Sequence, residues 1–280
     1  MRIVETIAEM QDVRRERWKR SSVVGFVPTM GALHDGHLSL VRRARSECES
    51  VVASIFVNPL QFGPGEDLAK YPRTFEEDCR LLELERVDVL FAPEAAEMYP
   101  HGSVTTVTVS EVGDRLDGAS RPGHFTGVAT VVAKLFHVVG TTRAYFGQKD
   151  AAQLAVLRQL VRDLNFDVEL VACAIVRDKD GLALSSRNKY LSAIERKQAL
   201  VLHQTLLQLE QMIGQGERQS IALTRRGMET LNSAAGIRVD YLAIVDPNTL
   251  LPVASAGTGT LVAVAAYVGS TRLIDNFLVT

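Results

Sequence analysis

Two histidines three positions apart, His34 and His37, could bind the phosphates of a nucleotide. They follow the apolar run 23–27 and open a helical pattern, with Gly31 and Gly36 beside them. A strand followed by a glycine-containing turn and a helix presents unpaired backbone N–H groups and the positive end of the helix dipole, which favour an anion. Glycine also lets a phosphate or a flat adenine ring approach the main chain. Both imidazoles share one helix face, so they could contact one phosphate chain.

The histidine pair has two other interpretations. An isolated His-x-x-His is more often a helix-capping turn whose histidines are surface polar groups. The pair could also belong to a zinc site, but the third ligand has no obvious local supplier among the six histidines and three cysteines. Three further polar clusters, each near the end of an apolar segment, favour the nucleotide site over these two interpretations.

The second cluster, residues 58–63, follows the strand-like run 51–57. Amide side chains both donate and accept hydrogen bonds, so Asn58 and Gln61 suit a small polyol or carboxylate substrate rather than proton transfer. The alternative is a turn in which asparagine, proline and glycine serve only the backbone.

The third cluster, residues 147–150, precedes a helical pattern. Lys149 lies near the helix start, where its charge opposes the helix dipole, so pairing with an anion such as a polyphosphate is favoured over a structural role. Asp150 is an ordinary cap for a helix. Gln153, about one turn further on, is expected to face the same side as Lys149 and Asp150.

The fourth cluster, residues 182–188, follows the strand-like run 168–176 and a turn. Ser185, Ser186 and Arg187 supply the donors that a triphosphate or a leaving pyrophosphate requires. A loop that carries them could close over a bound nucleotide. A capping serine beside a solvated arginine is the competing explanation.

The order of the elements predicts the fold that must position these clusters. Strand-like runs alternate with helical patterns, which indicates an α/β fold with a Rossmann-like, doubly wound parallel sheet. The runs are residues 23–27, 51–57, 87–91, 144–146 and 168–176. Ligands of such sheets bind beyond the carboxyl ends of the strands, where the clusters stand.

The pattern changes after residue 188. Ser192 and Glu195 form a capping-box motif that introduces a long helix through about Gly214, and residues 239–245 and 260–268 look like paired strands. We therefore predict a Rossmann-like domain that binds the nucleotide and the small substrate at 1–186 and a smaller α+β domain at 187–280.

Residues 104–109 alternate β-branched and polar side chains, as a half-exposed strand does. The partner of this strand could be a second subunit.

Composition favours an enzyme without a nucleic-acid or membrane partner. The 280 residues are 46% hydrophobic with a formal charge of −2, and the basic run 14–20 follows acidic residues, as on a solvated helix face. The scattered Cys48, Cys79 and Cys173 have no metal-site spacing, so reduced thiols are expected. The beginning of the chain has neither a secretory signal nor a membrane-spanning run, and we expect a cytoplasmic protein.

Together, the four clusters resemble the pantothenate synthetases, the AMP-forming pantoate–β-alanine ligases of the nucleotidylyl transferase superfamily. The resemblance covers nearly the whole chain, whereas the histidine motif alone indicates only the superfamily. The matching motifs are residues 28–37, 56–63, 121–125, 147–153 and 181–188.

This resemblance implies an ATP-dependent carbon–nitrogen ligase of pantothenate (vitamin B5) and coenzyme A biosynthesis. Such an enzyme condenses (R)-pantoate with β-alanine through a pantoyl adenylate and releases AMP and pyrophosphate. The resemblance also implies a homodimer and a smaller domain that covers the ATP site. Mg²⁺ should accompany ATP, held largely by phosphate oxygens and water. Glu76, Glu77 and Asp78 could be outer ligands of that ion, although the acidic first turn of a surface helix explains them as readily.

Matched position by position, the resemblance also assigns roles. His37 matches the proton donor, and His34 and Lys149 are the other candidate catalytic residues. The candidate ATP-binding positions are Met30, Gly31, Ala32, Leu33, His34, Asp35, Gly36, His37, Gly147, Gln148, Lys149, Asp150, Val176, Leu184, Ser185, Ser186 and Arg187. The candidate pantoate contacts are Gln61 and Gln153, and Gln61 also matches a residue near β-alanine.

The chain departs from the common family pattern at three positions. Leu184 stands where methionine is usual, and this change conserves apolar volume. Ala151 and Ala152 stand where larger residues are usual, so we expect them to widen the edge of the pocket.

Two rival functions come from different classes. One is a nucleotidylyl transferase that transfers AMP to a phosphorylated acceptor, which would release pyrophosphate without needing an amine. The other is a non-catalytic ATP-binding or sensing protein, which would bind ATP without turnover. The presence of both histidines, Lys149 and Arg187 favours catalysis.

Overall fold

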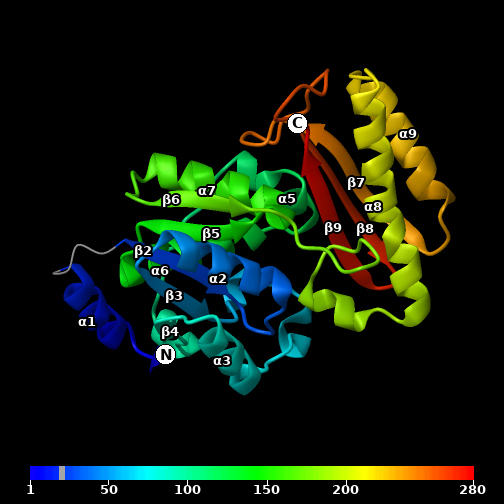
Figure 1. Ribbon diagram of the computed structural model, residues 1–280. Coiled ribbons are helices and arrows are strands. Elements are labelled where there is room, and N and C mark those ends of the chain that lie inside the picture. Colours follow the sequence, from blue (N-terminus) through cyan, green and yellow to red (C-terminus); the bar gives the residue numbers. More distant parts are fainter. Residues whose placement is uncertain (19–22) are drawn as a thin grey trace.

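The larger of two sheets has six parallel strands in the order β1-β4-β3-β2-β5-β6 (Figure 1). The computed structural model describes residues 1–18 and 23–280, so Lys19 and Arg20 of the basic run lie outside the described residues. The strands are β1 Arg2–Val4, β2 Val24–Thr29, β3 Ser50–Ile55, β4 Val89–Phe91, β5 Arg143–Gly147 and β6 Glu169–Cys173. The long helices of this part are α1 Ile7–Trp18, α2 Asp35–Glu47, α3 Phe75–Leu84, α6 His124–Val139 and α7 Ala151–Asp163.

Helices cover both faces of this sheet because its strands are apolar on both sides. Along β3, Val51 and Ala53 belong to the core shared with α2 and α3, whereas Val52 belongs to the core shared with α1, α6 and α7. Successive side chains of a strand point to opposite faces, so an uninterrupted apolar run packs against two layers. The predicted doubly wound α/β fold is confirmed.

Short helices connect these elements. They are η1 Pro59–Gln61, η2 Asp67–Lys70, α4 Ala95–Met98, η3 Val112–Asp114, α5 Asp117–Ser120 and η4 Gln148–Asp150. β2 lies between β3 and β5, so the loops that follow these three strands meet at one edge of the sheet. That edge carries the first three polar clusters.

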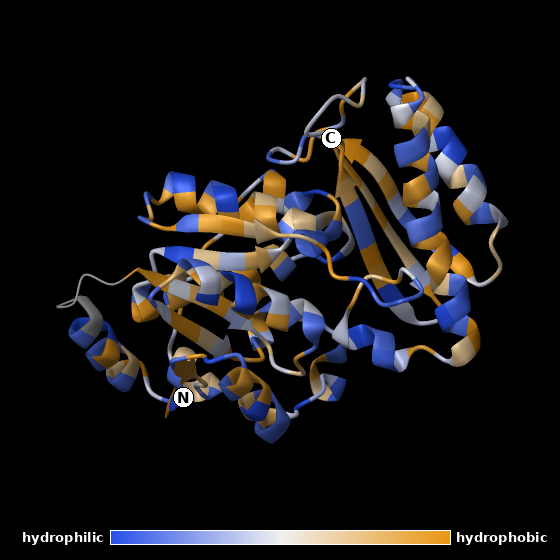
Figure 2. Ribbon diagram, in the orientation of Figure 1, coloured by the Kyte–Doolittle hydropathy of each residue, from blue (hydrophilic) through white to orange (hydrophobic). Residues whose placement is uncertain are grey.

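The second sheet is antiparallel and is covered by two helices. The sheet consists of β7 Ile237–Val245, β8 Leu261–Val268 and β9 Thr271–Leu278. The two covering helices are α8 Ala193–Gly214 and α9 Ser220–Ser233, and the short helix η5 Ser186–Tyr190 precedes them. The predicted capping box is present, since Ser192 Oγ accepts from the N–H of Glu195 at 3.2 Å and Glu195 Oε2 accepts from the N–H of Ser192 at 2.8 Å. Figure 2 shows hydrophilic and hydrophobic residues alternating along α8 and α9, as on helices with one buried face.

Sequence patterns missed two strands. β1 has only three residues, too few for a period to appear. β9 interrupts its apolar residues with Arg272, Asp275 and Asn276, which hides its alternation. The strand predicted at 168–176 is shorter in the structure, where β6 spans only Glu169–Cys173.

Residues 104–109 form no strand with the described part of their own chain, so the prediction that they pair with a second subunit stays a prediction. Val104 is 91% exposed, whereas Val107 and Val109 pack against the core. The N–H of Val107 donates to Thr130 Oγ1 at 2.9 Å instead of to a neighbouring strand. Separately, no helix in the described ranges combines the length and the apolar character needed to cross a membrane.

Gly127 on α6 allows the helix to contact the η1 loop closely. A methyl group at this position would collide with the carbonyl of Leu60 and would lie 2.6 Å from the backbone nitrogen of Gln61. The packing of α6 therefore depends on a glycine at this one position.

We predict that Gly127→Ala lowers the free energy of unfolding by about 1–3 kcal/mol, because the added methyl group pushes the η1 loop away from α6. Urea denaturation measures the change. Gly214→Ala is the matched control, since Gly214 ends helix α8 and has open space around its Cα, so the alanine should be neutral or stabilising by up to about 1 kcal/mol. Equal stability of the two variants would contradict this account of the packing.

Candidate active site

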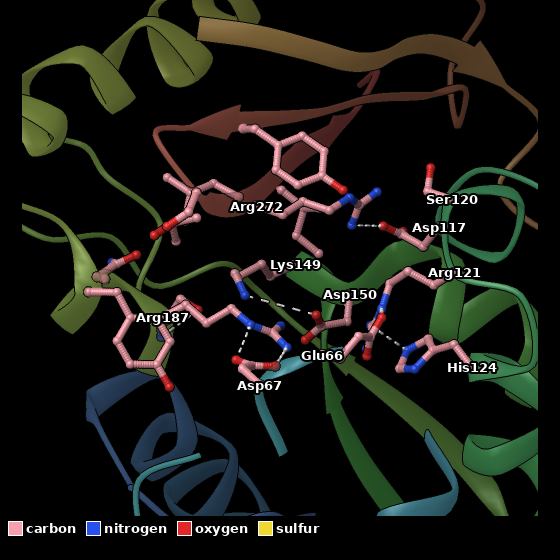
Figure 3. Close-up of a pocket in the computed structure, with 18 of the residues that line it drawn as sticks. Glu66, Asp67, Asp117, Ser120, Arg121, His124, Lys149, Asp150, Arg187 and Arg272 are labelled. Atoms are coloured by element: carbon pink, nitrogen blue, oxygen red, sulfur yellow. Dashed lines mark hydrogen bonds and ion pairs between the residues drawn. The ribbon is translucent and has the colours of Figure 1, made fainter. Parts of the chain in front are cut away.

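A cavity of about 760 Å³ lies between the two sheets and is rich in charged side chains (Figure 3). Lys149, Asp150, Gln153, Ser185 and Arg187 line it, so the third and fourth clusters converge there as predicted. These residues come from η4, α7 and the loop before α8, which are distant from one another in the sequence. The histidine loop and Gln61 are not among the lining residues but adjoin them.

The two histidines of the first cluster lie ring to ring at the start of α2. Their centroids are 4.1 Å apart, and His34 Nδ1 accepts from the N–H of Gly36 at 3.2 Å. His37 Nδ1 is buried and has no hydrogen-bond partner among the described residues. A buried polar atom without a partner is unfavourable by about 1–3 kcal/mol, and a bound ligand can remove that cost.

Burial and nearby positive charge keep both rings neutral. Burial, followed by the Lys149 ammonium, lowers the pKa of His34 to about 4. Burial, followed by His34 and Lys149, lowers the pKa of His37 to about 3. The charge of Lys149 therefore acts on both histidines, which links the first cluster to the third.

A buried carboxylate holds the loop that leads into the histidines. Asp78 on α3 accepts from the N–H groups of Ala32 at 2.9 Å and Leu33 at 2.8 Å. Gly31 and Ala32 have φ angles of 79° and 51°, a region that alanine rarely occupies, so this turn needs external support. The sequence suggested Asp78 as an outer magnesium ligand, but here its two oxygens bind the loop. The 45-residue separation between Leu33 and Asp78 hid this contact from local patterns.

The second cluster is joined to the first through Gln61. Its Nε2 lies 3.1 Å from Met30 Sδ, and its Oε1 accepts from Asn58 Nδ2 at 3.1 Å. Asn58 is itself fixed, because Nδ2 also donates to the carbonyl of Gly127 at 3.0 Å and Oδ1 accepts from the Tyr99 hydroxyl at 2.9 Å. Asn58 thus orients Gln61 toward the histidine loop.

Arg121 and His124, from the motif at 121–125, contact other residues of the protein. Arg121 binds both oxygens of Glu66 at 2.8 and 2.7 Å, and its NH1 lies 2.9 Å from His124 Nε2. His124 Nδ1 donates to the carbonyl of Gln61 at 2.7 Å. Burial, followed by the Arg121 charge, lowers the pKa of His124 to about 4, which keeps the ring neutral.

Arg187 extends into the cavity and binds an internal carboxylate. Its Nε and NH2 donate to Asp67 Oδ2 and Oδ1, both at 3.1 Å, and Lys149 Nζ lies 3.9 Å from Asp150 Oδ1 (Figure 3). Asp67 therefore occupies the position at Arg187 that an anionic ligand would compete for. Sequence reasoning missed Asp67, because an acidic residue in a polar loop carries no periodic signal.

Val176 and Leu184 are joined across a tight hairpin. The N–H of Leu184 donates to the carbonyl of Val176 at 2.9 Å, and Arg177 bridges to Ala183. A Cβ at Gly36 would lie 3.7 Å from Leu184 Cβ, so the hairpin reaches the histidine loop.

Ala151 and Ala152 do not widen the edge of the pocket. Both are buried in the core beneath the larger sheet, and neither lines the cavity. The expectation from the sequence was wrong because the first turn of α7 directs these two side chains into the core while Gln153 faces the cavity.

A parallel sheet whose β2–α2 turn carries paired histidines, beside a lysine and an arginine in a polar cavity, defines a nucleotide-binding α/β protein of the nucleotidylyl transferase class. The model of the pantoate-beta-alanine ligase family matches residues 2–278. The chain belongs to the pantoate–β-alanine ligase family.

Individual relatives match this chain over nearly their whole lengths. The chain is 57% identical to the pantothenate synthetase of Koribacter versatilis over 278 residues, which is 99% of this chain and 96% of that protein. The crystal structure of pantothenate synthetase from Thermus thermophilus has 52% identity and a TM-score of 0.93, with 100% and 99% of the two chains covered. The Francisella tularensis pantoate-beta-alanine ligase, solved with βγ ATP and β-alanine, has 35% identity and a TM-score of 0.79, with 99% and 97% covered.

We predict that His34 and His37 stay uncharged between pH 7 and pH 5 in the ligand-free protein. Their folded-state pKa values of about 4 and about 3 lie below the ordinary histidine value of about 6.5, so the unfolded chain takes up these protons first. The contribution of the two neutral rings to the free energy of unfolding is therefore fully present above about pH 6.5 and decreases as the pH falls toward 3. Nuclear magnetic resonance titration of the ring carbons measures this, and a midpoint near 6.5 for either ring would contradict it.

We predict that Asp78→Ala lowers turnover about 100-fold, because the released loop misplaces both histidines. Loss of two hydrogen bonds to a buried carboxylate should also lower the free energy of unfolding by about 2–4 kcal/mol, measured by urea denaturation. Glu83→Ala, an acidic-to-alanine change at an exposed position of the same helix, is the control and should change neither quantity. Wild-type turnover in Asp78→Ala would remove Asp78 from this role.

Proposed function

We propose that this cavity joins pantoate to β-alanine in two steps at the expense of ATP, the reaction of its family. The observation that carries the proposal is the convergence of the histidine loop, Lys149 and Arg187 beside Gln61. Cationic and neutral donors suit a polyphosphate, whereas an amide suits a small hydroxy acid.

The chemistry requires activation, because a carboxylate does not react with an amine at neutral pH. In the first step a pantoate carboxylate oxygen attacks the α-phosphorus of ATP, the bond to the bridging oxygen breaks, and pyrophosphate leaves. In the second step the amine of β-alanine attacks the acyl carbon, AMP leaves and the amine loses a proton. Positioning and charge stabilisation supply most of the catalysis in such transfers.

Each group has a role in the first step. Lys149 and Arg187 stabilise the charge that develops on the leaving pyrophosphate, and Arg187 exchanges Asp67 for a phosphate oxygen. The backbone N–H groups at the start of α2 bind the phosphates. His34 and His37 donate hydrogen bonds to the same chain, and the negative charge of ATP raises the pKa of His37 so that it can act as the proton donor.

The remaining candidate positions surround the nucleotide and the acid. Gln61 and Gln153 hold pantoate, and Gln61 also faces β-alanine. The nucleotide contacts are Met30 to His37, Gly147 to Asp150, the main chain of Val176, and Leu184 to Arg187. The smaller unit, which we place at residues 187–280, covers this site.

Mg²⁺ accompanies ATP in this proposal. No cluster of three histidine, cysteine or acidic residues suited to a metal occurs in the described ranges. Asp67 and Glu66 bind arginines, which leaves Asp150 as the carboxylate nearest to Lys149. The ion would therefore be held chiefly by phosphate oxygens and water, with Asp150 as its protein contact, and it would neutralise charge on the leaving pyrophosphate.

The assay that tests this function mixes the purified protein with Mg-ATP and pantoate, with and without β-alanine. AMP and pantothenate should appear in equal amounts and only when β-alanine is present. Repeated turnovers of pyrophosphate release without an amine would favour the rival transferase, because the ligase can release only about one pyrophosphate per active site before it needs β-alanine. ATP binding without any product would favour the rival binding protein. Such a ligase acts on soluble metabolites, which is consistent with a cytoplasmic location and no nucleic-acid partner.

We predict that His37→Ala lowers turnover about 10²- to 10⁴-fold, the range expected when a proton donor or charge stabiliser is removed. Steady-state formation of AMP measures the effect. Near wild-type rates would exclude His37 from the mechanism.

Lys149→Ala should raise the KM for ATP and lower turnover, because the variant loses the charge beside the phosphates, while the KM for β-alanine stays almost constant. The same assay at varied substrate concentrations separates the two parameters. If only the KM for β-alanine changed, the proposed position of Lys149 beside the phosphates of ATP would be wrong.

A homodimer is also part of the proposal. The extended segment 104–109 presents Val104 to solvent and pairs with no strand of its own described chain, so a second copy can provide the partner. Light scattering at micromolar concentration should give twice the chain mass of 30.7 kDa. A monomeric mass would contradict the dimer.

A further inference from the structure

β9, the last strand of the chain, contacts the turn that presents Lys149. Its Asn276 is 2% exposed, and Nδ2 donates to the carbonyl of Gln148 at 3.1 Å and to the carbonyl of Lys149 at 2.9 Å. Asn276 Oδ1 also accepts from Gln148 Nε2 at 3.0 Å. One buried amide therefore makes three hydrogen bonds to two consecutive residues of η4.

The neighbouring residue of β9 supports the other nucleotide-facing segment. Asp275 is buried and accepts from Arg177 at 2.6 and 2.9 Å, and Arg177 also donates to the carbonyl of Gly181 at 3.2 Å. Gly181 precedes the loop that carries Arg187. Two adjacent residues of the smaller sheet thus hold the two segments that bring Lys149 and Arg187 into the cavity.

We propose that Asn276 is a positioning residue that fixes Lys149 relative to the phosphates of ATP. The inference rests on the proposed function, because it takes the polyphosphate as the partner of Lys149. Asn276 does not line the cavity, so its effect passes through the backbone of η4.

The geometry explains why one amide can have this effect. η4 is a three-residue turn between the end of β5 at Gly147 and the start of α7 at Ala151, and its backbone has fewer hydrogen bonds of its own than the interior of a long helix. Lys149 is the middle residue of that turn, so a shift of its carbonyl also moves the base of its side chain. A displacement of about 1 Å can lower a rate about 100-fold.

A double-mutant cycle between Asn276 and Lys149 tests the proposal. In the wild-type background, Asn276→Ala should lower kcat/KM for ATP about 10- to 100-fold and leave the KM for β-alanine within about twofold. In a Lys149→Ala background, the same change should cost no more than about twofold, because the group that it positions is already gone. AMP formation by the purified full-length chain, with Mg-ATP, pantoate and β-alanine, provides all four values.

Two comparisons distinguish a loss of positioning from a folding defect. Asn232→Ala, at an exposed position of α9, makes the same chemical change away from the cavity and should leave all parameters unchanged. If Asn276→Ala is too unstable to purify, Asn276→Leu replaces it, because leucine keeps the volume of the side chain and removes its hydrogen bonds to Gln148 and Lys149. It should produce a loss of the same kind, which again disappears in the Lys149→Ala background.

Equal losses in both backgrounds, or no loss in either, would overturn the positioning role. In that case Asn276 acts independently of Lys149 or serves stability alone. A wild-type protein that makes no pantothenate would instead overturn the proposed function, so the two failures are distinguishable.

Discussion

The site depends on one constraint, which is the parallel pairing of β2 between β3 and β5. Parallel strands end at a common edge, so the loops after these strands must meet although they are far apart in the sequence. The histidine loop, Gln61 and Lys149 each lie within a few residues of the end of one of these strands. The hydrophobic cores on both faces of the sheet therefore determine where the polar chemistry takes place.

Internal carboxylates prepare this edge for anions. Asp78 holds the backbone of the histidine loop, Glu66 binds Arg121, and Asp67 binds Arg187. The backbone of the histidine loop and the guanidinium groups of Arg121 and Arg187 are thus held by carboxylates of the protein itself, and in the proposed function a phosphate oxygen replaces Asp67 at Arg187. Lys149, which lines the cavity, has only Asp150, 3.9 Å away, as an ion-pair partner among the described residues. Its charge adds to the larger effect of burial in lowering the pKa of both histidines.

Local patterns in the sequence predicted most of the elements and the residues at strand ends. The apolar runs of β2, β3 and β5 and the capping box of α8 are strong local signals, so their positions agree closely with the structure. The supporting groups were missed, because Asp78, Asp67 and Asn276 act over separations of 45, 120 and 127 residues. Only the tertiary fold creates such contacts, and no spacing rule along one chain reports them.

A crystal structure with pantoate and a non-hydrolysable ATP analogue would test the central claim most directly. The account predicts that the triphosphate lies against the start of α2 and contacts His34, His37 and Lys149. A phosphate oxygen should replace Asp67 as the hydrogen-bond partner of Arg187. Pantoate should lie against Gln61 with its carboxylate facing the α-phosphorus. A nucleotide bound elsewhere, or bound at this edge with Lys149 and both histidines turned away from its phosphates, would contradict the account.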